Sequence, residues 1–283
     1  MAEEKIRFSR RTFLKRAGLG LLSAGALGAL DAGLERFWVH TRELKLPVRG
    51  LPEPFKGWRI VQFSDTHFGF HYDGEHFRNV VRIINGHNPD IVFFTGDLID
   101  REWLNTPSSK VLPALQELHT PRGGKWAVLG NHDYAARQEA IELLRQAGFR
   151  VLINANGFVE EQGQRICIAG TDEYMFGRFD MKKTLEGKAA NDCVLLLAHE
   201  PDLADISATY GVNAQFSGHS HGGQIRKPFS QPFFTPELGK KYTDGLYSVG
   251  DRKMPLYVNR GIGTSFLPIR MFCRPEVTLF HLM

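Results

Sequence analysis

Cysteine is scarce in this chain, which has three cysteines in 283 residues. Three thiols cannot all pair within one chain, and Cys167 and Cys193 lie inside apolar, strand-like runs, where they are typical of small buried residues. The sequence shows no disulfide framework. Because 42% of the residues are hydrophobic, the chain can bury one substantial core. We therefore expect a single domain held together by that core.

Excess charge is lacking outside the N-terminus. The formal net charge is +4, and six basic and two acidic side chains within residues 1–16 account for all of it. The neutral remainder argues against a broad surface for nucleic acid, although a local basic patch is compatible with it. We therefore expect no nucleic-acid-binding surface.

Long hydrophobic runs are also lacking. The apolar run Ala17–Leu30 has fourteen residues, whereas a membrane-spanning helix needs about 20. It follows the basic stretch "SRRTFLK" (Ser9–Lys15), which resembles a twin-arginine export signal. We expect residues 1–32 to be a signal or anchor segment that engages the twin-arginine export machinery. The protein would then be periplasmic or at the outer face of the cytoplasmic membrane. An ordinary basic amphipathic helix is the alternative, and cleavage of the segment remains open.

Residues 33–56 read as a linker, because Pro47, Pro52 and Pro54 limit regular structure there. From residue 57 to 283, short apolar runs alternate with helix-like segments, which is typical of helices packed on a largely parallel sheet. "GFVEEQGQRICIAG" (Gly157–Gly170) reads as a hairpin, and the last strands lack helices between them. This pattern predicts an α/β domain over residues 57–283, with a second sheet or an antiparallel edge.

Residues of types that can bind a metal ion follow one predicted strand after another. Ligands of open α/β sheets bind at the carboxyl ends of strands, so these side chains are expected to share one crevice. They are Asp65 and His67, Asp97, Asn131 and His132, His199, and His219 and His221.

The ligand types in this set suit two cations. Carboxylates, an amide oxygen and imidazoles without a thiolate are accepted by borderline divalent metals such as Mn, Fe, Zn or Co. Even without His132, the seven remaining ligands are too many for one catalytic zinc ion, which typically has three protein ligands and an open position. We therefore expect two divalent metal ions that share one carboxylate.

The motifs "DTH", "GDLID", "GNHD", a lone strand-end histidine and "GHSH" resemble, in this order, the five motifs of the calcineurin-like metallophosphoesterase family. The resemblance extends from about Trp58 to Gln224, and "GHSHGGQ" and "LPIRMFCRPEV" further resemble its exported phosphodiesterases of the YkuE and YaeI type. It implies a sandwich of two mixed β-sheets flanked by helices. It also implies the metal ligands: Asp65, His67 and His221 for one ion, Asn131, His199 and His219 for the other, and Asp97 as the bridge.

The same resemblance implies the catalytic residues. His132 matches a histidine that binds no metal and faces the phosphate, Asp100 matches the acid that orients it, and Arg101 matches an arginine that contacts phosphate. Two cations would activate a hydroxide and align its attack on phosphorus, and His132 would protonate the leaving oxygen. Separately, Gly96, Gly130 and Gly218 are expected to let the chain turn sharply at strand ends and to bring the backbone close to metal or phosphate.

We expect a phosphodiesterase that acts on lipid- or envelope-related diesters or diphosphates. A non-catalytic binding platform on the same fold is the rival, and a pyrophosphate hydrolase of UDP-diacylglucosamine type is a further alternative. Other residues have open roles near the site. His71 and His76 could reach substrate, and Asp133 is expected to steady its loop. The pair Asp172 and Glu173 reads as a solvated turn, with a place in the pocket lining as the alternative. Phe229, Phe233 and Phe234 form either a lip that touches acyl chains or a membrane, or part of the core.

Overall fold

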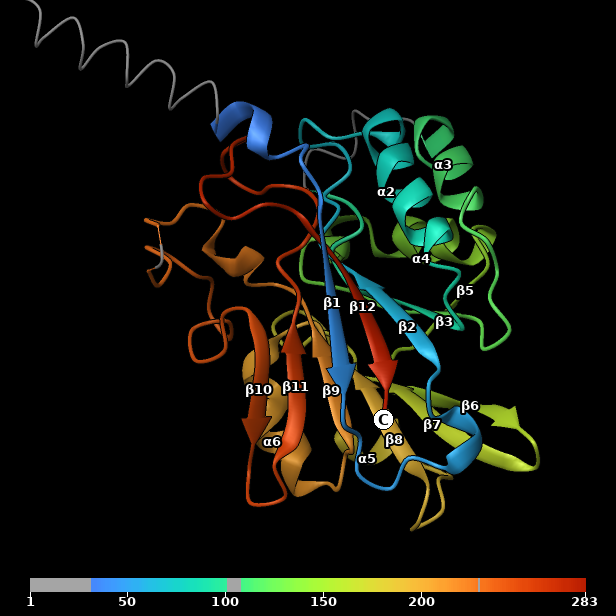
Figure 1. Cartoon of the computed structure of the whole chain (residues 1–283). Coiled ribbons are helices and arrows are strands. Elements are labelled where there is room, and N and C mark those ends of the chain that lie inside the picture. The colour runs from blue at the N-terminus through green and yellow to red at the C-terminus, as the bar shows by residue number, and fades with distance from the viewer. Residues whose placement is uncertain (1–31, 101–107, 229) are drawn as a thin grey trace, which may run out of the picture.

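The computed structural model describes residues 32–100, 108–228 and 230–283, which form two six-stranded sheets packed face to face (Figure 1). The first sheet contains, in spatial order, β1 (His40–Leu46), β12 (Glu276–Leu282), β2 (Arg59–Phe63), β3 (Ile91–Thr95), β4 (Lys125–Val128) and β5 (Phe149–Val151). The second contains β10 (Gly245–Val249), β11 (Met254–Val258), β9 (Ala214–Ser217), β8 (Cys193–Leu197), β7 (Gln164–Gly170) and β6 (Ala155–Glu161).

Both sheets are mixed, as predicted. Strands β2 to β5 are parallel, and so are β7, β8, β9 and β11. Antiparallel pairs join β12 to β2, β6 to β7 and β10 to β11. The predicted hairpin is β6 with β7, and the late strands divide between an antiparallel edge and the first sheet.

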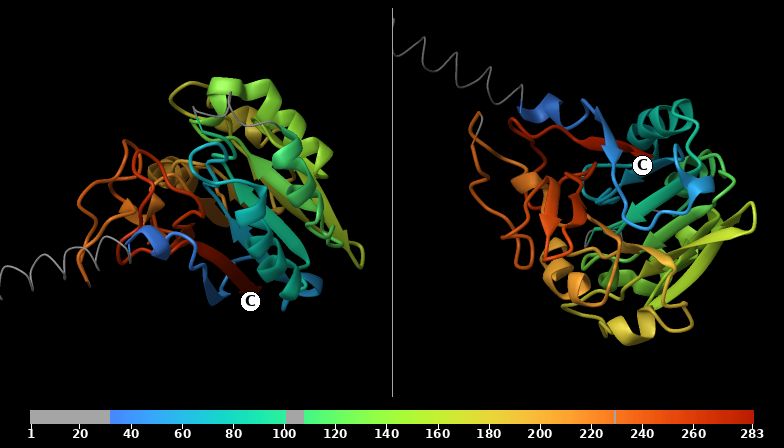
Figure 2. Two further views of the ribbon diagram at one scale, coloured as in Figure 1. Left: turned by 90° about the horizontal axis from the view of Figure 1, so that it is seen from above. Right: turned by 60° about the horizontal axis from the view of Figure 1, so that its bottom comes forward.

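Helices cover the outer face of each sheet (Figures 1 and 2). On the first sheet these are α2 (Gly74–Gly86), α3 (Leu112–Gln116) and α4 (Arg137–Gln146); on the second they are α5 (Met181–Thr184) and α6 (Ala204–Thr209). Short 3-10 turns complete the connections at η1 (Glu53–Phe55), η3 (Ser108–Lys110), η4 (Asp133–Ala136), η5 (Pro201–Leu203) and η6 (His221–Gly223).

The alternation of side chains along the strands divides the core into layers. In β2, Ile60 points to the cluster between the two sheets, whereas Val61 packs under the helices. The helix α2 presents Val80 and Ile84 to the same cluster as Val61, and its first turn is capped because the Asp73 side chain accepts from the His76 amide. The strands are thereby held firmly on both sides.

The stretch 33–56 has more regular structure than its prolines predict. It contributes β1, which pairs in parallel with β12 over its full length, from His40 with Glu276 to Leu46 with Leu282. The prolines only end this strand, because Pro47 follows it directly. Its partner, β12, lies more than 200 residues later in the sequence, so no local pattern could predict the pairing.

The predicted signal segment, residues 1–32, lies outside the described residues except for Ala32. Among the helices of the described ranges, none combines the length and hydrophobicity that crossing a bilayer requires. Cys167, Cys193 and Cys273 are free and buried, as the absence of a disulfide framework led us to expect.

Candidate metal centre

The carboxyl ends of five strands, β2, β3 and β4 from one sheet and β8 and β9 from the other, meet at one edge of the sandwich. Backbone hydrogen bonds join the loops that follow them: the Asp65 amide donates to the Gly96 carbonyl at 2.9 Å, and the Gly218 amide donates to the His199 carbonyl at 3.0 Å. The metal-type residues predicted at separate strand ends are therefore brought together.

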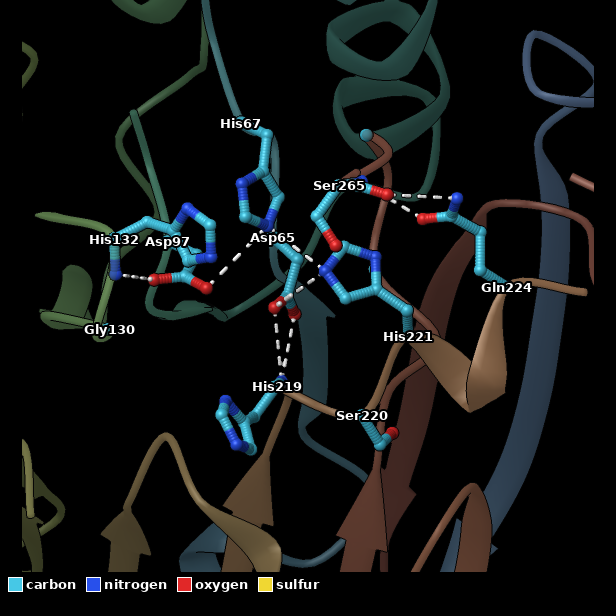
Figure 3. Close-up of polar contacts among 12 residues, drawn as sticks. Asp65, His67, Asp97, Gly130, His132, His219, Ser220, His221, Gln224 and Ser265 are labelled. Atoms are coloured by element: carbon cyan, nitrogen blue, oxygen red, sulfur yellow. Dashed lines mark hydrogen bonds and ion pairs between the residues drawn. The ribbon is translucent and has the colours of Figure 1, made fainter. Parts of the chain in front are cut away.

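The first group consists of Asp65, His67 and His221, all of them buried, whose ligand atoms lie within 4.8 Å of one another. The Nε2 atoms of His67 and His221 are 3.0 Å apart, and Nε2 of His221 is 3.6 Å from Oδ1 of Asp65. Figure 3 shows the two imidazoles and this carboxylate turned toward a common point. The group offers two nitrogen ligands and one oxygen ligand to a cation.

The second group consists of Asn131, His199 and His219. Oδ1 of Asn131 is 3.3 Å from Nε2 of His199 and 3.0 Å from Nδ1 of His219, and these two nitrogens are 3.2 Å apart. Three potential ligand atoms from β4, β8 and β9 thus converge on one small volume.

Asp97 lies between the two groups. Its Oδ2 atom is 3.5 Å from Nε2 of His67 in the first group and 3.3 Å from Nε2 of His199 in the second. Its other oxygen, Oδ1, accepts a hydrogen bond of 2.8 Å from the His132 amide, which fixes the direction of the carboxylate. This is the position that a bridging carboxylate occupies in a two-metal site.

Outer hydrogen bonds show that the second group fits a cation. His199 donates through Nδ1 to the Thr95 carbonyl at 2.7 Å, and His219 donates through Nε2 to the Glu237 carbonyl at 2.7 Å. In the neutral rings the inner nitrogens then carry lone pairs, and both face the amide oxygen of Asn131. These three lone-pair atoms face one another without a hydrogen-bond donor between them, and a metal ion bound there would be coordinated by all three.

The first group is fixed in a similar way. Nδ1 of His67 donates to Oδ2 of Asp100 at 2.8 Å, which leaves the lone pair of its Nε2 facing His221 and Asp97. A carboxylate behind a ligand histidine orients the ring and raises its basicity. The residues present therefore fit metal binding in both groups.

The protonation states of the metal-free centre support this conclusion. Burial by itself would raise the pKa of Asp97, but His199 and His132 hold that pKa well below its usual value. Burial lowers the pKa of His199, yet Asp97 outweighs it and raises this pKa well above the usual value. Burial and His199 lower the pKa of His219 to about 3. Without metal, His199 therefore keeps its proton, and this positive charge beside Asp97 lies where a bound metal ion would replace it.

His132 lies at the inner end of a cavity and belongs to neither group of predicted ligands. Its Nδ1 is 3.1 Å from Oδ2 of Asp100, the same oxygen that accepts from His67. Burial raises the pKa of Asp100, but its hydrogen bonds to His132 and His67 prevail and lower it below the usual value. The carboxylate therefore stays ionised and orients both rings.

The backbone of the centre is unusual at the ligands. Asp65, His67, Asp97, His219 and His221 all have left-handed conformations, with φ of 52°, 46°, 56°, 69° and 52°. Residues other than glycine rarely adopt this region, and such residues cluster at functional sites because the surrounding structure must enforce them. These turns aim successive side chains into one space.

Glycines make room for the ligands, as their place in the motifs predicts. Gly96 has a φ of 99°, and a Cβ atom there would lie 2.5 Å from Nδ1 of His199. Gly218 has no positive φ, but a Cβ atom would overlap the Asp65 carboxylate and the Ser64 hydroxyl. Its role is close approach rather than a special turn.

A cavity of about 500 Å³ opens from the centre to the surface. Its floor includes Asp97, Asn131 and His132. Its mouth is formed by five apolar side chains that are each more than a third exposed, and we call these residues the apolar rim: Met175, Phe233, Phe234, Phe266 and Leu267.

Two expectations about neighbouring acids have different outcomes. Asp133 steadies its loop as expected, because its carboxylate accepts from the amides of Ile99 and Gly130 at 3.0 and 2.9 Å. The solvated turn expected at Asp172 and Glu173 is wrong, since both residues are buried. Their carboxylates accept several backbone amides of residues 173–178, which shape the loop that carries Met175.

The remaining expectations concern residues beside the centre. His76 forms a hydrogen bond with the Asp73 carboxylate and stacks on the ring of Phe37. Neither His76 nor His71 lines the cavity, where a substrate would be expected to bind. Arg101 and Phe229 lie outside the described residues. Phe233 and Phe234 are exposed at the mouth rather than packed in the core.

Three contributors escaped the sequence reasoning. The Glu237 carbonyl orients His219, and a backbone group leaves no signal in the sequence. Gln224, the last residue of "GHSHGGQ", holds the loop of Phe266: it exchanges hydrogen bonds with the Ser265 backbone (Figure 3) and donates to the Leu267 carbonyl. Arg270 is fully buried and its Nη2 lies 3.5 Å from Nδ1 of His221. The stretch "LPIRMFCRPEV" contained it, but nothing local marked its burial.

Comparison with known proteins agrees with this geometry. The model of the calcineurin-like phosphoesterase family matches residues 59–223, which include all the residues of both groups. The metallophosphoesterase YkuE of Bacillus subtilis (strain 168) is 39% identical over 287 residues, covering 98% of both chains.

Two further relatives have more specific names. The phosphodiesterase YaeI of Escherichia coli (strain K12) is 28% identical, over 97% of this chain and 99% of its own. The UDP-2,3-diacylglucosamine pyrophosphatase LpxG of Chlamydia trachomatis (serovar D) is 29% identical, over 82% of this chain and 86% of its own.

Proposed function

The chain belongs to the calcineurin-like phosphoesterase family, and from this premise we propose that it is a phosphodiesterase that uses two divalent metal ions on lipid- or envelope-related diesters or diphosphates. The enzyme class itself, a metal-dependent phosphoesterase, follows from the family. The observation that carries the proposal is the shared carboxylate of Asp97, which lies between two ligand groups at the floor of a cavity with an apolar mouth.

In this proposal each group holds one metal ion. Asp65, His67 and His221 hold the first, Asn131, His199 and His219 hold the second, and Asp97 bridges them. Such a pair of Mn, Fe or Zn ions supplies an activated water and neutralises phosphoryl oxygens. The ligands named here provide no thiolate, which agrees with these borderline metals.

His132 is proposed to donate a proton to the leaving oxygen of the ester. Its Nδ1 faces Asp100 at 3.1 Å, so its Nε2 is the ring atom that can serve the substrate. The ionised Asp100 favours the protonated imidazole, because an opposite charge nearby stabilises the charged form. Arg101 remains a predicted phosphate contact, since it lies outside the described residues.

The apolar rim supports a substrate with an apolar part. Phosphoryl groups need charged partners, which the floor provides, whereas Phe234 and Phe266 at the mouth offer only apolar contact. The name of LpxG, a hydrolase of a diacylated sugar nucleotide, supports an acylated substrate, and the name of YaeI supports hydrolysis of a phosphodiester. A UDP-diacylglucosamine-type diphosphate therefore belongs in the substrate panel as the alternative to an envelope diester.

The site of action is proposed from the N-terminal sequence. Residues 1–32 resemble a twin-arginine signal, so we place the enzyme in the periplasm or at the outer face of the cytoplasmic membrane. Substrates of the envelope would be accessible there, whereas a cytoplasmic lipid precursor would not.

The test is turnover by metal-loaded protein. Protein loaded separately with Mn, Zn, Fe or Co and checked by elemental analysis is assayed on bis(p-nitrophenyl) phosphate, then on phospholipids, acylated sugar diphosphates and nucleotides. We expect hydrolysis of the model diester and preference for acylated substrates. Folded protein that binds metal yet hydrolyses none of them would favour a non-catalytic platform instead.

A further inference from the structure

We infer that the face around the mouth of the cavity docks on an anionic phospholipid bilayer, so that the mouth opens toward the lipid. Three separate loops bring the apolar rim together: Met175 follows β7, Phe234 follows β9, and Phe266 follows β11. Phe234 is 67% exposed and Phe266 is 75% exposed. Single exposed apolar residues are normal on proteins, but a cluster at one opening marks an interaction site.

A second hollow, of about 650 Å³, adjoins the rim and carries positive charge. Its lining includes Trp38, Lys227, Phe272 and Arg274. Nζ of Lys227 lies 5.2 Å from the ring centre of Phe233, which links the hollow to the rim, and the Arg274 guanidinium lies 3.7 Å over Trp38.

The charges of Lys227 and Arg274 are available to a ligand. Within the described ranges neither side chain has a carboxylate oxygen within 4.0 Å, whereas their neighbours Arg226 and Arg260 both pair with Asp244. Cations beside exposed aromatic rings suit a membrane interface, where the rings enter the head-group region and the cations meet anionic lipid phosphates. We call Lys227 and Arg274 the cation pair.

The path of the chain favours a bilayer over a protein partner. The Ala32 carbonyl accepts from the Arg270 amide at 3.0 Å, and the Glu35 carboxylate accepts from the Phe272 and Cys273 amides at 2.9 and 2.8 Å. The first described residues are therefore tied to the loop that follows Phe266, and they lie on the same side of the molecule as the long connection between β9 and β10 (Figure 2). The apolar run Ala17–Leu30 directly precedes this point in the sequence, so a bilayer that takes up the run lies beside the rim.

Docking in this orientation has a consequence for access to the cavity. A lipid in the adjoining leaflet could bring its phosphate to the floor of the cavity while its acyl chains stay against the apolar rim. This last step rests on the proposed function, but the docking itself does not. Docking can be measured without any turnover of substrate.

The experiment uses the full chain in bilayer nanodiscs and an environment-sensitive fluorophore on single introduced cysteines. Phe234→Cys and Phe266→Cys report on the rim, and Gln164→Cys on the exposed start of β7, at the opposite side of the molecule (Figure 1), is the control. The native cysteines are buried, and unsubstituted protein gives the labelling background. With phosphatidylglycerol present, we expect blue-shifted emission and quenching by brominated lipid at 234 and 266 but not at 164.

Charge reversal tests the cation pair. Lys227→Glu with Arg274→Glu is compared with Arg252→Glu and Lys253→Glu, which make the same change in the turn between β10 and β11. Two lost cations should weaken docking on phosphatidylglycerol discs by at least about 20-fold, since each contributes roughly a factor of five near an anionic surface. The control pair should dock like the unsubstituted protein.

Three results would overturn the inference. Rim labels as accessible to aqueous quencher as the label at 164 would show that this face does not meet lipid and serves another partner, such as a protein. Equal docking of the two charge-reversed variants, or equal docking on pure phosphatidylcholine, would remove the anionic bilayer as the ligand. Because fluorescence needs no hydrolysis, failure of the docking and failure of the proposed activity are distinguishable.

Discussion

The floor and the rim of the cavity are built in opposite ways. At the floor, a term used from here on for the lining and the metal centre directly behind it, Asp65 and His199 are almost completely buried, and the ligand rings are held by hydrogen bonds to groups behind them, such as the Thr95 carbonyl. At the rim, Phe234 and Phe266 project into solvent from loops. The comparison indicates that the floor fixes which reaction occurs, because its geometry is enforced by both sheets. We expect the rim to decide which molecules reach it.

The change expected to damage the floor most is Asp97→Asn. It removes the carboxylate between the two ligand groups, so both metals should be lost and hydrolysis should fall to background. Elemental analysis and diester turnover measure the two effects. Asp251→Asn, an exposed aspartate in the turn between β10 and β11, is the matched control and should change neither. Full metal content in Asp97→Asn would contradict the bridging role.

His132→Ala separates chemistry from metal binding at the floor. The side chain belongs to neither ligand group, so metal content should remain while the turnover number falls by about 10² to 10⁴-fold, the usual range for a lost general acid. Single-turnover kinetics on metal-loaded protein give the rate. Metal loss equal to that of Asp97→Asn would show that His132 is a ligand and not a proton donor.

Asp100→Asn should weaken both metal binding and turnover, but metal binding less than Asp97→Asn does and turnover less than His132→Ala does. Its Oδ2 atom contacts Nδ1 of His67 and of His132, at 2.8 and 3.1 Å. Loss of a carboxylate behind a ligand histidine typically weakens metal binding by about 10 to 100-fold. Titration with a competing chelator measures this, and an affinity identical to that of unsubstituted protein would restrict Asp100 to orienting His132.

The floor should also bind metal more tightly as the pH rises. His199 has a raised pKa in the metal-free protein, so it keeps its proton above the usual titration range and must release it when a metal binds. Affinity should therefore increase by up to about tenfold per pH unit until that raised pKa is passed, and then level off for this proton. Calorimetry in buffers of different ionisation enthalpy counts the protons. Uptake instead of release would contradict the ligand role of His199.

The rim should give the smallest effect, and a selective one. Phe266→Ser with Leu267→Ser removes apolar contact worth a few kcal/mol at most. The ratio of turnover on acylated substrates to turnover on bis(p-nitrophenyl) phosphate should therefore fall by about tenfold. Leu246→Ser, an exposed apolar residue of β10 that lines neither the cavity nor the second hollow, is the control. An unchanged ratio would show that the rim does not influence which substrate is preferred.

The sequence predicted the floor far better than the rim. Asp65, Asp97 and His199 each follow a short apolar run that predicts a buried strand, and parallel strands end at a common edge. The motif order then supplied the grouping of the ligands, which spacing alone left open. What the pattern could not show was the left-handed backbone at these ligands, since it is enforced by contacts between distant loops.

The misreadings have a common physical cause. Asp172 and Glu173 looked like a solvated turn because a polar pair after a strand reads the same whether its carboxylates face water or backbone amides. The strand β1 was missed because its partner β12 lies at the far end of the chain. In both cases the deciding contact is absent from the local sequence.

The pairing of β1 with β12 also constrains how the protein is made. Strand β12 lies between β1 and β2, so the first sheet stays incomplete until residues 276–282 have left the ribosome. Contacts between such distant segments form slowly, since a long loop must close before they contribute. Cotranslational folding can therefore pair β2 to β5 first, whereas the first sheet is completed only after β12 has emerged.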